Sequence, residues 1–137
     1  MWEYCDTFIV NINIDYHLQA QFYMYSFFLY LMSGLYVFAG VMHFLKPKMY
    51  LRIIPPYIPN PKLMNLLAGA FEILFGLGLL FSETRAYAAF GIIILLIAVF
   101  PANLYMYQKG ARGIPKWALL LRLPLQFGLI AWAYLYT

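Results

Sequence analysis

Charge is scarce in this sequence, and apolar residues take its place. Of 137 residues, 10% are charged and 65% are hydrophobic, and the mean hydropathy is +0.75. A soluble globular domain carries roughly 25% charged residues, so this composition excludes most soluble classes. The net charge of +4 does not indicate nucleic-acid binding, because the Lys and Arg residues lie in short loops rather than along one helix face. We expect the lipid bilayer as a partner, and no nucleic acid.

Cysteine and histidine are also rare, which restricts the chemistry. Cys5 is the only cysteine, so the chain has no internal disulfide and no pair for thiol exchange. With two histidines, and no acidic residue at helical spacing from His43, we expect no metal site. The sequence also lacks a haem-ligand pair and the glycine motifs of flavin and nucleotide sites. If the protein takes part in electron transfer, another subunit must hold the cofactor.

Four apolar segments predict transmembrane helices, since a span needs about 20 apolar residues. The segments are residues 22–45, 62–81, 86–107 and 117–136. Residues 1–23 are predicted to be an extramembrane tail, and residues 24–137 the transmembrane domain. The predicted fold is all-α, a four-helix transmembrane bundle.

Proline and glycine are placed where they shape the predicted helices. The proline-rich residues 46–62 exclude a continuous helix and predict an ordered cap in the membrane interface, with one helical turn near residues 49–53. Asn60 before Pro61 predicts a polar cap and a helix start. The helix-shaping residues, which lack a backbone N–H or a Cβ, are Pro47, Pro55, Pro59, Gly69, Gly76, Pro101 and Pro124.

Each predicted span places a polar group in the same half of the membrane. These groups are His43, Glu72, Asn103, Arg122 and Gln126. A charge in the bilayer costs about 2.5–3.5 kcal/mol on insertion scales, so we expect one shared cluster in which Glu72 pairs with Arg122. Three interpretations stay open: a purely structural clip, a site for a quinone-like or lipid-like ligand, and a pathway for protons or ions.

Five motifs in register resemble the DoxX-like family of small bacterial integral membrane proteins, over about residues 26–137. They are GVMHF (40–44), PKMYLRIIPPYIPNP (47–61), AGAFEILFGLGLL (68–80), VFPANLYM (99–106) and LRLPLQF (121–127). The resemblance implies a four-helix bundle in the bacterial inner membrane and an accessory role in redox or oxidative-stress complexes. The family's motif positions fall on His43, Pro47, Pro55, Pro59, Glu72, Pro101, Asn103, Arg122, Pro124 and Gln126.

The preferred functional hypothesis is a non-catalytic accessory subunit of a membrane redox system, with a redox-complex protein as partner and a polar pocket for a quinone or lipid. One alternative is a quinone-linked oxidoreductase subunit in which Glu72, Arg122 and His43 handle protons. The other is a small transporter or proton pathway. The transporter would require a homo-oligomer, because four helices leave little room for a lumen.

The distribution of basic residues predicts the orientation in the membrane. The first and third loops contain Lys46, Lys48, Arg52, Lys62, Lys109, Arg112 and Lys116, whereas the opposite side has only Arg85. By the positive-inside rule these two loops are cytoplasmic and both termini lie outside. A reporter active only in the cytoplasm should be inactive when fused after Thr137 and active when inserted within residues 109–116. The opposite pattern would overturn this topology.

Overall fold

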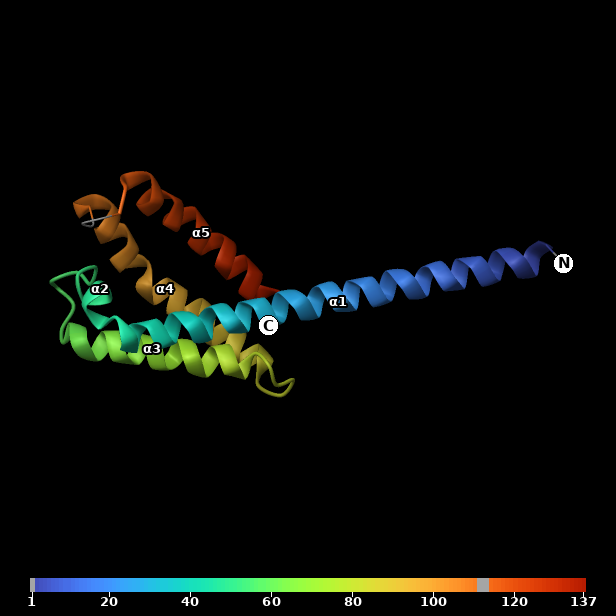
Figure 1. Ribbon diagram of the computed structural model, residues 1–137, viewed down its shortest axis with the longest axis horizontal. Coiled ribbons are helices and arrows are strands. Elements are labelled where there is room, and N and C mark those ends of the chain that lie inside the picture. The colour runs from blue at the N-terminus through green and yellow to red at the C-terminus, as the bar shows by residue number, and fades with distance from the viewer. Residues whose placement is uncertain (1, 111–113) are drawn as a thin grey trace. The chain divides into compact units, whose positions relative to one another are not determined.

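The computed structural model describes the backbone of residues 2–110 and 114–137, and the side chains of residues 15–110 and 114–137. Over these residues the protein is helical, with no β-strand, which confirms the all-α class. The helices are α1 (Trp2–Leu45), α2 (Pro47–Leu51), α3 (Pro61–Gly78), α4 (Arg85–Lys109) and α5 (Lys116–Tyr134) (Figure 1). Residues 111–113 of the predicted third loop lie outside the described part.

The chain forms two units, residues 1–32 and residues 33–137, and the boundary falls inside α1. The predicted tail of residues 1–23 is helical from Trp2 onward. Among the described residues, Asp15–Leu45 of α1 is long and apolar enough to cross a membrane. The domain boundary at residue 23 stays a prediction.

The described residues include three helices that are long and apolar enough to cross a membrane, so the predicted count of four spans is not confirmed. The three candidates are Asp15–Leu45, Arg85–Lys109 and Lys116–Tyr134. Helix α3 falls short because its 18 residues include Lys62, Asn65 and Glu72, which lower its mean hydropathy. The fifth helix, α2, is the short helical turn within the proline-rich segment.

The proline-rich segment contains the predicted helical turn and helix start, and its place in the membrane interface stays a prediction. Helix α2 begins at Pro47, where the missing N–H costs no intrahelical hydrogen bond. Pro55 is fully buried. Asn60 precedes α3, but its side chain makes no capping hydrogen bond. Instead, Asn60 adopts a left-handed conformation (φ 48°), which asparagine tolerates, and its carbonyl accepts the first helical bond from Met64 N–H at 3.0 Å.

Glycines bring α3 close to the last turns of α1, and Figure 1 shows the two running together. A Cβ added to Gly69 would lie 2.7 Å from His43 Cβ and 2.9 Å from the carbonyl oxygen of Gly40. A Cβ added to Gly76 would lie 3.0 Å from the backbone nitrogen of Val37. Ser33 Oγ also donates to the Gly76 carbonyl at 2.7 Å. Two backbones can approach this closely only where side chains are absent.

Helix α4 packs against both α3 and α5, so it is the central helix of this unit. Its residues Ala88, Ala89 and Ile92 are buried. Pro101 lies inside α4 and Pro124 inside α5. Each proline removes one intrahelical hydrogen bond and kinks its helix.

The glycine contacts generate a matched test of packing. Gly69→Ala should destabilise the protein by about 1–3 kcal/mol, because the new methyl group must displace backbone and Cβ atoms of α1. Gly128→Ala is the control, since a Cβ there meets no atom within 4 Å. Thermal unfolding in detergent measures both. Equal melting temperatures for the two variants would show that α1 and α3 do not pack through Gly69.

Candidate functional site

A cavity of about 410 Å³ lies where the C-terminal end of α1 meets the other four helices. It is lined by residues of all five helices and by Ile53, Ile54 and Ile58 of the proline-rich segment. Its volume falls within the range of roughly 300–1,000 Å³ that is usual for small-molecule sites. All of its lining residues belong to the unit of residues 33–137.

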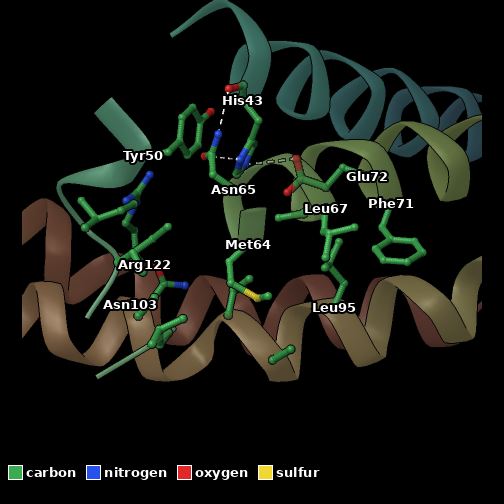
Figure 2. Close-up of a pocket in the computed structure, with 17 residues that line it drawn as sticks. His43, Tyr50, Met64, Asn65, Leu67, Phe71, Glu72, Leu95, Asn103 and Arg122 are labelled. Carbon is green, nitrogen blue, oxygen red and sulfur yellow. Dashed lines mark hydrogen bonds and ion pairs between the residues drawn. The ribbon is translucent and has the colours of Figure 1, made fainter. Parts of the chain in front are cut away.

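The cavity is amphipathic. Figure 2 shows Tyr50, Asn65, Asn103 and Arg122 gathered toward one side, with His43 above them. Apolar side chains occupy the other side, namely Leu67, Phe71 and Leu95, and Glu72 lies above them. A molecule that fits this cavity therefore needs a polar end and an apolar body.

Asn65 holds His43 at two points. The amide Nδ2 of Asn65 donates to the backbone carbonyl of His43 at 3.0 Å, and its Oδ1 lies 2.9 Å from His43 Nδ1. Because Oδ1 can only accept, Nδ1 of His43 must carry the hydrogen. Asn65 is buried, so the removal of either bond would leave a costly unpaired polar atom. The imidazole also stacks on the Tyr50 ring, with 3.7 Å between centroids.

The carboxyl group of Glu72 lies against the second ring nitrogen of His43, Nε2. Its Oε2 lies 3.5 Å from His43 Nε2, is buried, and has no hydrogen-bond partner within the described part of the chain. Since Nδ1 holds the hydrogen, a neutral His43 would present the lone pair of Nε2 to a carboxylate. That arrangement is repulsive, whereas a proton on Nε2 or on the carboxyl group would let the two groups share a hydrogen bond. The His43–Glu72 pair can therefore hold one proton.

Tyr50 belongs to α2, outside the candidate spans. Burial is the largest effect on its hydroxyl and raises its pKa above the ordinary value. The phenol therefore keeps its proton at neutral pH and remains available as a hydrogen-bond donor at the polar side of the cavity.

Asn103 and Gln126 join α4 to α5. Asn103 Nδ2 donates to Gln126 Oε1 at 2.9 Å, and Gln126 Nε2 donates to the backbone carbonyl of Leu96. This second bond reaches α4 one turn before Pro101. Asn103 lines the cavity, whereas Gln126 is buried behind it. Gln126 therefore positions Asn103 and does not itself face the cavity.

The predicted ion pair between Glu72 and Arg122 is absent from the described side chains, where Glu72 pairs with His43 instead. Both Glu72 and Arg122 line the cavity. Helix α5 packs on α4 and makes no direct helix contact with α3, so the cavity lies between the two charges. Arg122 Nη1 makes one weak contact, with Met106 Sδ at 3.5 Å.

The sequence analysis did not assign Asn65 or Tyr50 to the cluster. Asn65 precedes Glu72 by seven residues, two helical turns, so its place on the same face was a usable signal. Tyr50 had no such signal, because its position against His43 depends on how the proline-rich segment folds back. Among the described residues, no group of three His, Cys, Asp or Glu side chains could hold a metal ion.

A double-mutant cycle distinguishes the two pairings of Glu72. The combination of Glu72→Gln with His43→Gln should show a coupling free energy of about 0.5–3 kcal/mol, which is typical of residues in direct contact. The combination of Glu72→Gln with Arg122→Gln should be closer to additive, because no direct contact joins the two. Thermal unfolding in detergent provides the measurement. A larger coupling with Arg122 than with His43 would contradict the observed pairing.

Comparisons with known proteins give a family and no activity. No curated protein and no solved structure matches the chain. The sequence model of one family, the domain of unknown function DUF8561, matches residues 32–137 and so covers the unit that contains the cavity. The resemblance to the DoxX-like family stays a prediction. The chain belongs to the DUF8561 family.

Proposed function

We propose that this protein is a non-catalytic accessory subunit of a redox system in the bacterial inner membrane, and that it binds one quinone or lipid molecule in its cavity. It would be a DoxX-like bundle of four transmembrane helices with both termini outside. The amphipathic cavity carries the proposal, because it offers hydrogen-bonding groups on one side and an apolar wall on the other.

The fourth span would be α3. Its 18 residues extend about 27 Å at 1.5 Å per residue, close to the hydrocarbon thickness of about 30 Å. Its polar residues do not prevent insertion, since Asn65 and Glu72 interact with His43 of α1. Polar groups satisfied inside a bundle are tolerated at membrane depth.

One observation favours a second candidate, a quinone-linked oxidoreductase subunit. The His43–Glu72 pair can hold a proton at the cavity wall, which is the group needed to protonate or deprotonate a quinone oxygen. This role would still require an electron carrier on another subunit. Oxidation or reduction of a quinone by the isolated protein would favour it over the accessory role.

Cavity filling tests the binding function. Native mass spectrometry of the detergent-extracted protein should show a bound quinone or lipid together with any copurifying subunit. Ala68→Phe, on the cavity wall, should remove the bound molecule, because the new ring occupies the space. Ala70→Phe is the control, because Ala70 is on the same helix, exposed and outside the cavity lining.

The comparison of Ala68→Phe with Ala70→Phe decides whether the bound molecule occupies the cavity. Melting temperatures must show that both variants fold. Retention of the same ligand by Ala68→Phe, or a wild-type protein that carries no ligand, would overturn the proposed binding site.

A further inference from the structure

We propose that the ligand of this cavity is an acidic amphipath, whose carboxylate or phosphate group binds Arg122 while its chain lies along Phe71 and Leu95. This inference rests on the proposed binding function and narrows it, since a neutral quinone has no such anionic group. The carboxylate of a fatty acid and the phosphate of a single-chain lipid share the recognised chemistry.

Arg122 has an unmatched positive charge at the cavity. The one carboxylate among the lining residues, Glu72, is engaged by His43, and no other ion pair is present among the described residues. The guanidinium has five N–H donors, and the single hydrogen bond recorded for it goes to the weak acceptor Met106 Sδ. Carboxylate and phosphate oxygens match the paired donors of a guanidinium better than any other common ligand group.

The position of Arg122 along α5 leaves room for a counter-charge, since Arg122 is exposed and lines the cavity. Helix α5 begins at Lys116, so Arg122 lies six residues, or about 9 Å, along the helix axis from its start. A charge at membrane depth is costly unless an opposite charge neutralises it. Because the described part of the protein supplies none, an anionic ligand is the group that would complete the site.

The other polar groups are compatible with an anion. The Tyr50 hydroxyl keeps its proton and can donate a second hydrogen bond to the same headgroup. A proton shared by His43 and Glu72 would make that pair neutral overall and remove its repulsion of an oxyanion. With the pair neutral, the lining has a net charge of +1, which comes from Arg122.

The test compares ligand pairs that share the same oleoyl chain and differ in whether the headgroup carries a negative charge. Two ligand pairs are titrated against the delipidated full-length protein in neutral detergent, together with a neutral quinone. The pairs are oleate with methyl oleate, and 1-oleoyl-glycerol-3-phosphate with 1-oleoylglycerol. Native mass spectrometry reports the bound fraction. Each acid should bind at least about tenfold more tightly than its neutral partner, and the better acid identifies the headgroup.

Variants of α5 show whether Arg122 causes the preference for the acids. Arg122→Gln should abolish the preference for the acid over its neutral partner, whereas Arg122→Lys should keep part of that preference. Lys116→Gln is the control, because it removes the same charge from the same helix outside this cavity.

The possible failures are distinguishable. Binding of quinone or neutral lipid without preference for the acids would overturn this inference and leave the proposed binding function standing. A preference for the acids that persists in the Arg122→Gln variant would also overturn this inference and leave the proposed binding function standing. If no probe binds, the proposed binding function fails as well. If an Arg122 variant does not fold, the ligand pairs measured on the wild-type protein still decide the test.

Discussion

The contact between Gly69 of α3 and the last turns of α1 fixes the geometry of one wall of the cavity. Without a Cβ at residues 40 and 69, the two backbones approach closely enough for Asn65 to reach both the backbone and the ring of His43. This two-point attachment sets the orientation of the imidazole. Glu72 lies two turns further along α3 and therefore meets the free nitrogen of the same ring. One helix contact thus positions three of the polar groups.

The opposite wall of the cavity depends on side-chain hydrogen bonds between α4 and α5. Helix α4 continues through Pro101, and Gln126 of α5 links to α4 on both sides of that proline, at Leu96 and at Asn103. A proline in a buried helix is tolerated where neighbouring side chains supply hydrogen bonds to the disturbed region. The link holds α5 against α4 and places Arg122, one turn earlier on α5, at the cavity.

These two halves enclose a space because α3 and α5 do not touch. The charges of Glu72 and Arg122 therefore face a common cavity, and each has a different partner.

The sequence by itself determined the all-α class, and the predicted segments 62–81, 86–107 and 117–136 agree with α3, α4 and α5 to within a few residues. Helix α1, in contrast, begins at Trp2, well before the predicted start at residue 22. Hydropathy and helical periodicity depend on local composition, which explains the agreement for α3, α4 and α5. The left-handed start at Asn60, the stacking of Tyr50 on His43, and the partner of Glu72 were decided by the tertiary structure alone. Charge and depth make Arg122 and His43 equally reasonable partners for Glu72, and the choice depends on which helices pack directly. That packing is set by the glycine contacts between α1 and α3, which the sequence showed only as small residues on one face.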